Sequence, residues 1–86
     1  MANNDDLIKQ FVKERNEAVY TFDVATFKAF YRRWVKRGFY SDNMLPSDNI
    51  IEISLRKMVL GIANAPEEKR EEARAWLKAR GYRESF

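Results

Sequence analysis

Five Lys and Arg side chains between residues 28 and 37 are the group in this chain best suited to chemistry, and that chemistry is the binding of an anion. The group contains no Asp or Glu and consists of Lys28, Arg32, Arg33, Lys36 and Arg37. Lys28, Arg32 and Lys36 recur at intervals of four residues, so in a helix they line one side. Each like-charge pair costs a helix roughly 0.2–0.5 kcal/mol, and a phosphate backbone would relieve that repulsion. Tyr40 adds a ring on which a nucleic-acid base could stack.

The same cations have a purely structural interpretation. Solvent and salt screen exposed charges, and acids from another helix could neutralise them. The candidate acids are Glu67, Glu68, Glu71 and Glu72. The net charge of +3 is too small to indicate a nucleic-acid partner by itself. The sequence therefore favours a solvated or neutralised face, with a nucleic-acid-binding face as the alternative.

Catalytic and metal sites lack their usual residues. The chain has no Cys and no His, which removes sulfur-based zinc sites and the commonest general base. The acids of residues 67–72 could share one helix face, but an acid-rich helix start does so routinely and has no partner nucleophile here. We expect a protein that is not an enzyme and that uses no metal, no cofactor and no small-molecule substrate.

The elements that must position these residues are helices, because apolar residues recur with helical spacing in four segments and no alternating strand pattern occurs. The segments are residues 5–20, residues 23–38, a segment that begins between 46 and 49 and ends near 63, and residues 64–81. We predict an all-α fold, a compact bundle of four short helices. It forms one domain over residues 1–86, with a disordered N-terminus at 1–4 and a C-terminal tail at 84–86.

Turn chemistry marks the ends of these helices. Asp23 is a good N-cap, and Gly38 can adopt the left-handed conformation that ends a helix. The segment 39–47 is the longest loop. Asn64 and Pro66 indicate the cap and first turn of the last helix, and Gly81 its end.

Stepping by 100° per residue separates the rings of residues 23–38 from the cations. The apolar arc of roughly 140° contains Val24, Phe27, Phe30, Tyr31, Trp34 and Val35, and the cations lie opposite. We therefore assign these rings to the core. Tyr20, Phe39 and Tyr40 lie outside the arc and are expected to be exposed, and Trp76 is expected to anchor the last helix.

The third helix has two apolar faces. One face contains Ile51, Leu55, Met58, Val59 and Ile62, and the other contains Ile50, Ile53 and Leu60. A helix that is apolar on two sides is central in its bundle or buried against a partner. Ile50, Ile53 and Leu60 are therefore the predicted protein interface, with another protein or with a second copy in a homodimer.

Arg15 occupies the centre of an otherwise apolar face of the first helix. Burial of an unpaired charge costs several kcal/mol, so Arg15 should either extend along the rings to water or meet a carboxylate such as Asp48 or Glu52. We favour a structural buried ion pair of Arg15. An anion site at Arg15 is the alternative.

Two motifs resemble a group of small uncharacterised bacterial proteins encoded in phage and other mobile-element regions. The first is Glu14 to Glu17 with the turn at Phe22 and Asp23, and the second is Ala73 to Leu77 with Gly81 and Tyr82. The resemblance implies an accessory role in mobile elements and no particular activity.

The first residues of the chain and its hydropathy bear on location. Residues 1–6 lack the basic and apolar segments of a signal peptide, and no apolar run approaches membrane-spanning length. We expect a cytoplasmic location and no membrane contact. The function favoured by the sequence is a non-enzymatic protein-interaction or adaptor domain, with nucleic-acid binding as the alternative.

Overall fold

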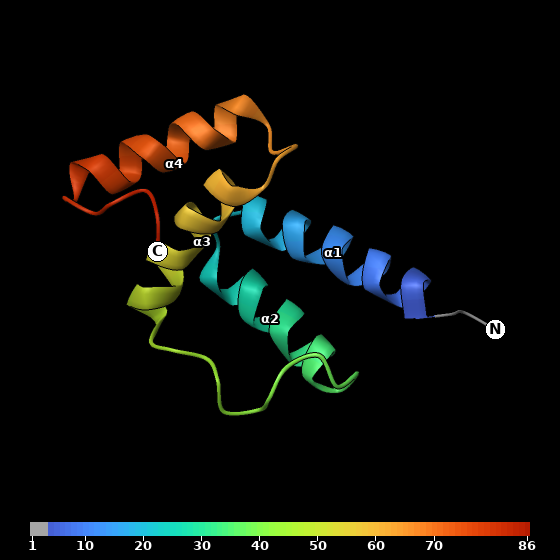
Figure 1. Ribbon diagram of the computed structural model, residues 1–86. Coiled ribbons are helices and arrows are strands. Elements are labelled where there is room, and N and C mark those ends of the chain that lie inside the picture. Colours follow the sequence, from blue (N-terminus) through green and yellow to red (C-terminus); the bar gives the residue numbers. More distant parts are fainter. Residues whose placement is uncertain (1–3) are drawn as a thin grey trace. The chain divides into compact units, whose positions relative to one another are not determined.

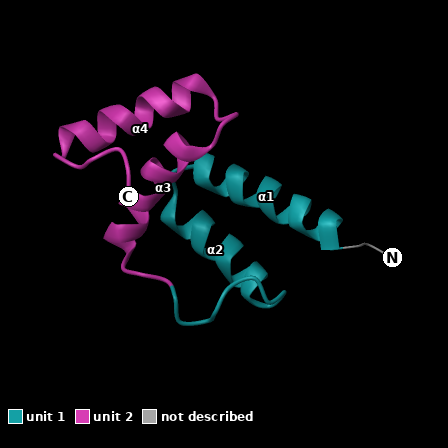
Figure 2. Cartoon of the chain, in the orientation of Figure 1, with its two compact units in different colours: residues 1–44 teal, residues 45–86 magenta. Residues whose placement is uncertain are grey.

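Four helices make up the computed structural model, which describes residues 4–86 (Figure 1). They are α1 (Asn4–Tyr20), α2 (Val24–Val35), α3 (Asp48–Gly61) and α4 (Glu67–Ala79). No strand occurs within the described residues. The chain divides into two compact units, Met1–Met44 with α1 and α2, and Leu45–Phe86 with α3 and α4 (Figure 2). The predicted all-α class with four short helices is confirmed.

Unit 1 is a helical hairpin with a very short turn. Phe22 in that turn has a φ of 54°, which is uncommon for a residue with a side chain. Asp23 then caps α2 as predicted, since its carboxylate accepts a hydrogen bond from the backbone N–H of Thr26 at 2.9 Å. The short turn places α1 and α2 side by side, so their apolar faces share one core.

Aromatic rings fill the core of unit 1. The Phe11 ring of α1 lies 5.1 Å from that of Trp34 and 4.8 Å from that of Phe39, measured between ring centres. The predicted core rings of α2 are confirmed as buried: Phe27, Phe30, Tyr31 and Trp34. Val24 and Val35, at the edges of the predicted arc, are half-buried.

The end of α2 folds the chain back onto this core. Gly38 has a φ of 83°, the Gly38 N–H donates to the Val35 carbonyl at 3.0 Å, and the Phe39 N–H donates to the Trp34 carbonyl at 2.9 Å. These two bonds define a Schellman motif, which needs the left-handed residue that Gly38 supplies. The helix ends at Val35, three residues before the predicted end, and the Phe39 ring packs edge-on against Trp34.

Unit 2 is a second helical pair. A stripe of buried side chains on α3, spaced by four residues, consists of Ile51, Leu55 and Val59, and Ala73 and Leu77 are the buried residues of α4. The predicted cap at Asn64 is wrong, because Pro66 occupies the N-cap position of α4. Ile62, assigned from the sequence to a face of the third helix, lies beyond its last turn as the C-cap residue.

Unit 2 ends in the same motif as unit 1. Gly81 has a φ of 75°, and N–H groups of Gly81 and Tyr82 donate to the carbonyls of Lys78 and Leu77. Trp76 precedes its glycine by five residues and Trp34 precedes its glycine by four. One residue turns a helical side chain by about 100°, so Trp34 is fully buried whereas Trp76 is half-buried. Leu77 is the fully buried side chain of the last turns of α4, while Trp76 meets α3 through Arg56, whose guanidinium lies 4.4 Å from the centre of its ring.

The predicted segments outside the helices have mixed outcomes. Residues 1–3 of the predicted disordered N-terminus lie outside the described residues, whereas Asn4 belongs to α1. Residues 84–86 follow α4 as a tail. The prediction of one domain over residues 1–86 stays a prediction.

Candidate functional site

The five cations of α2 and its C-terminal turn, here called the basic face, are arranged as the sequence predicted. Arg32, Arg33, Lys36 and Arg37 are exposed and Lys28 is half-buried. Burial of the ring stripe fixes the orientation of α2 and leaves Arg32, Arg33 and Lys36 on the solvent side, whereas Lys28 and Arg37 lie at the two edges of the stripe. No acid interrupts the row.

One acid from α1 faces part of this row. The Glu14 carboxylate accepts a hydrogen bond from Trp34 Nε1 at 3.2 Å, and its Oε1 lies 3.5 Å from Arg33 Nη2. A hydrogen bond from Gln10 lowers the pKa of Glu14, and Trp34 and the charges of Arg33 and Arg37 lower it further. Glu14 is therefore held ionised and neutralises one edge of the basic face.

Glu14 was missed by sequence reasoning, which looked for neutralising acids in α4. The signal that could have found it is the short turn between the first two helices, which requires them to be neighbours. Which acid of α1 meets Arg33 depends on the register of the pair, and the packing of Phe11 on Trp34 sets that register.

The remaining cations differ in their surroundings. The Arg37 guanidinium lies over the Trp34 ring, 4.5 Å from its centre. Among the described residues of unit 1, no acid forms an ion pair with Arg32 or Lys36, and both side chains are exposed. Arg32 and Lys36, spaced by four residues, are thus the open part of the basic face.

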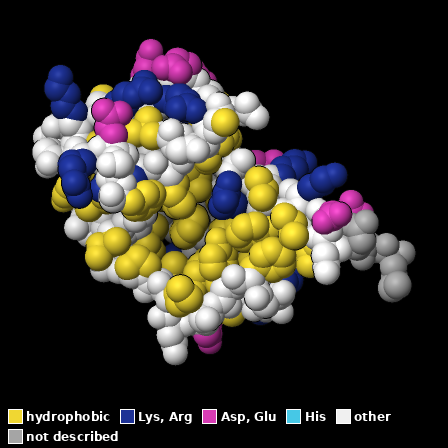
Figure 3. Space-filling model, viewed as in Figure 1, with side chains coloured by type: hydrophobic (Ala, Val, Ile, Leu, Met, Phe, Trp, Pro, Cys, Tyr) yellow, Lys and Arg dark blue, Asp and Glu magenta, His cyan; other side chains and the backbone are white. Residues whose placement is uncertain are grey.

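Acids of α4 pair within their own helix. Glu67 Oε1 lies 3.4 Å from Arg74 Nη1, and Glu72 Oε2 lies 3.6 Å from Lys69 Nζ. On the face shown in Figure 3, acidic and basic side chains lie beside one another along α4. Neutralisation of the basic face by Glu67 to Glu72 stays a prediction, and these two contacts already satisfy two of the four acids.

Tyr40 is not the exposed ring that the sequence predicted. Its ring stacks on that of Tyr31, with 4.5 Å between ring centres, and also contacts Phe11 and Phe30. Burial raises the pKa of the Tyr40 hydroxyl. Phe39 and Tyr20 are likewise half-buried. The basic face therefore offers exposed cations for phosphates, whereas the ring predicted to stack on a base, Tyr40, is partly covered by other rings of unit 1.

The predicted ion pair of Arg15 with Asp48 or Glu52 would join residues of the two units and stays a prediction. Arg15 is half-buried. Within unit 1 its guanidinium donates two hydrogen bonds to Asn16 Oδ1, at 3.2 and 3.0 Å. A long side chain of this kind can lie along apolar surface while its charged end meets polar groups.

The predicted protein interface on α3 has one open residue. Ile50 is 49% exposed, whereas Ile53 and Leu60 are half-buried. Ile50 lies in the first turn of the helix, and the predicted interface of these three residues stays a prediction.

Metal-binding groups and membrane-spanning helices were sought in the described part of the chain. Residues 4–86 contain no group of Asp or Glu side chains arranged to hold a metal ion. None of the four helices is long and apolar enough to cross a membrane.

Comparison with other proteins leaves the resemblance to mobile-element proteins a prediction. Neither a family model, nor a curated protein, nor a solved structure matches this chain.

Proposed function

We propose that this chain is a small non-enzymatic binding domain whose basic face contacts the phosphate backbone of a nucleic acid. The observation that carries the proposal is the open pair Arg32 and Lys36, which is exposed and forms no ion pair with the described residues of unit 1. A cytoplasmic location and an accessory role in a mobile element belong to the same proposal.

The regular spacing of the cations favours a regularly charged partner. Lys28, Arg32 and Lys36 rise along the helix in steps of about 6 Å, at 1.5 Å per residue. A nucleic acid presents phosphates along the whole row, whereas acids on a folded protein would each have to be positioned separately. Since the Tyr40 ring is stacked on Tyr31, binding would use contacts to phosphates, and such contacts carry little sequence preference.

Salt dependence of binding tests this proposal. Four phosphate contacts give a slope of log affinity against log salt of about −3.6 for duplex DNA and about −2.8 for a single strand. We expect such slopes by fluorescence anisotropy, and Arg32→Gln with Lys36→Gln should make the slope shallower by about 1.8 for duplex DNA and about 1.4 for a single strand.

Lys9→Gln with Lys13→Gln is the matched control, because it removes two exposed cations at the same spacing from α1. Absence of binding to either nucleic acid at low salt would refute the proposal. An equal loss in the control pair would show that total charge, and not the basic face, governs binding.

A protein-interaction domain is the second candidate function, favoured by the exposed Ile50 on α3. Sedimentation across a concentration series with Ile50→Lys would test self-association, with Met44→Lys as control, since Met44 is 66% exposed but lies in the loop before α3. A dimer weakened by Ile50→Lys alone supports this candidate. A monomer at all concentrations contradicts the homodimer.

A further inference from the structure

A cleft beside the last turns of α4 is the second cationic feature of the chain. It has a volume of about 610 Å³ and lies entirely within unit 2. Its charged lining consists of Arg74, Lys78, Arg83 and Glu84, and Tyr82 forms part of its wall. Three cations and a single acid leave the lining with a net positive charge.

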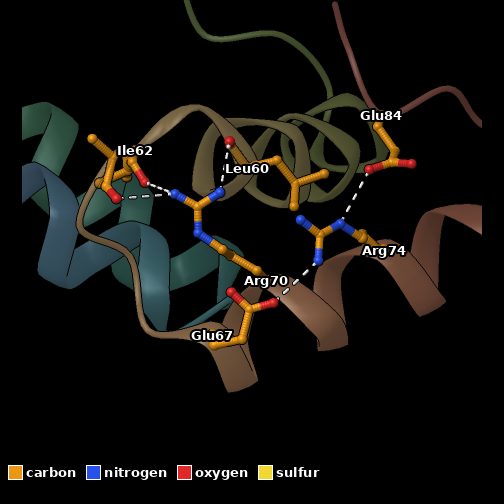
Figure 4. A network of polar contacts seen from close by, with 7 residues as sticks. Leu60, Ile62, Glu67, Arg70, Arg74 and Glu84 are labelled. Atoms are coloured by element: carbon orange, nitrogen blue, oxygen red, sulfur yellow. Dashed lines mark hydrogen bonds and ion pairs between the residues drawn. The ribbon is translucent and has the colours of Figure 1, made fainter.

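The acid in this lining, Glu84, already contacts Arg74 as an anionic ligand would. Glu84 Oε1 lies 3.3 Å from Arg74 Nε, and Glu67 Oε1 lies 3.4 Å from Arg74 Nη1 (Figure 4). Glu84 reaches Arg74 because Gly81, with a φ of 75°, reverses the chain after α4. A carboxylate from the tail thus lies in the wall of the cationic cleft, in contact with Arg74.

Other contacts hold the tail on unit 2 without burying it. The Tyr82 ring stacks on the Trp76 ring, with 6.3 Å between centres and 17° between planes. Lys57 Nζ lies 5.8 Å from the centre of the Phe86 ring. The Glu84 side chain remains 64% exposed, so solvent and dissolved ions reach the ion pair. Such an exposed contact is weak and exchangeable.

The geometry points to a binding site for a phosphate monoester in this cleft, which Glu84 occupies in the absence of ligand. A phosphate carries more charge than a carboxylate at neutral pH and three acceptor oxygens, so it meets more of the three cations at once. Arg74 offers a planar set of donors suited to phosphate, and Lys78 supplies a compact charge. Release of Glu84 would free the Arg74 Nε–H for the ligand.

The competition between Glu84 and phosphate for Arg74 lowers the apparent phosphate affinity by an amount that can be estimated. Exposed ion pairs contribute 0.2–1 kcal/mol in protein hosts, so the closed tail outnumbers the open tail by about 1.4- to 5-fold. The apparent affinity falls by the fraction of open molecules. Glu84→Gln should therefore bind phosphate about two- to six-fold more tightly than the unmodified chain.

An NMR titration of the full chain with inorganic phosphate, at constant ionic strength, tests the site. The Arg74 Nε–H and the backbone N–H groups of residues 78–84 should shift together. Glu68→Gln is the charge-matched control: it removes an exposed acid from the first turn of α4, outside the cleft. Its affinity should equal that of the unmodified chain.

Arg74→Gln with Lys78→Gln should abolish the phosphate-induced shifts. Circular dichroism checks that this variant is folded. Phosphoserine and adenosine monophosphate, used as further probes, distinguish a modified protein from a nucleotide as the source of the phosphate. The site is refuted if shifts do not localise to the cleft or if the double variant binds equally well. The tail's role is refuted if Glu84→Gln binds no more tightly than Glu68→Gln.

Discussion

Arg70 should contribute more to stability than any other charged residue of unit 2, because it caps the end of α3. Its Nη1 donates to the Leu60 carbonyl at 3.2 Å, and its Nη2 donates to the Ala63 carbonyl at 3.2 Å and to the Ile62 carbonyl (Figure 4). The final carbonyls of a helix lack partners within the helix. One side chain of α4 thus contacts three carbonyls around the turn between the two helices, of which that of Ile62 also accepts the Ala65 N–H at 3.1 Å.

The magnitude follows from the surroundings of each bond. The contacts to Leu60 and Ile62 are partly buried, whereas the contact to Ala63 is exposed, so water can replace it. Hydrogen bonds to charged groups contribute about 1.5–3 kcal/mol each, and partial exposure reduces that value. We expect Arg70→Met, which keeps the aliphatic stem, to lower the free energy of unfolding by about 2–4 kcal/mol.

Arg74→Met is the matched control on the same helix. Arg74 contacts two exposed carboxylates, those of Glu67 and Glu84, and exposed ion pairs contribute about 0–1 kcal/mol. The assay is urea unfolding followed by circular dichroism and by the amide signals of residues 48–79. For a domain of this size the Arg70 variant should also lose at least about 8 °C in Tm. Equal losses in the two variants would refute the reasoning.

Two further predictions concern helix ends. Gly61→Ala should stabilise the chain by about 0.5–1 kcal/mol, and Gly38→Ala should destabilise it by about 1–2 kcal/mol, as measured by urea unfolding. A Cβ added at either glycine would meet no atom within 4 Å, so the opposite effects on stability come from the φ of 83° at Gly38. Stability changes of the same sign in the two variants would contradict this explanation. Hydrogen bonds from the Thr26 side chain and backbone lower the pKa of Asp23, so its contribution is present above the unfolded-state pKa and is lost as the pH falls through the folded-state pKa. Asp23→Asn keeps a capping side chain that does not titrate. Any stability advantage of the unmodified chain over this variant should therefore shrink in acid. An advantage that is constant with pH would contradict the role given to the Asp23 carboxylate.

Local signals predicted the helices well. The cap at Asp23, the glycine at position 38 and the ring stripe of α2 all depend on residues within one or two helical turns. Such short-range features are encoded by backbone conformation and side-chain spacing, so they can be derived without knowledge of the partner helix.

Features that depend on contacts between elements were predicted poorly. Tyr40 was expected to be exposed because it lies outside the stripe of α2, but the Schellman turn at Gly38 brings the following residues back onto the core. The reversal of the backbone at Gly38, and not the helical spacing of Tyr40, decided that outcome.

The sequence alone determined the all-α class, the separation of rings from cations on α2 and the anionic nature of any ligand of that face. Those properties follow from composition and helical periodicity. The tertiary structure decided which cations remain open, because the pairing of α1 with α2 brings Glu14 to Arg33 and leaves Arg32 and Lys36 exposed. It also revealed the cleft that Glu84 occupies, since only the chain reversal at Gly81 brings that carboxylate to Arg74.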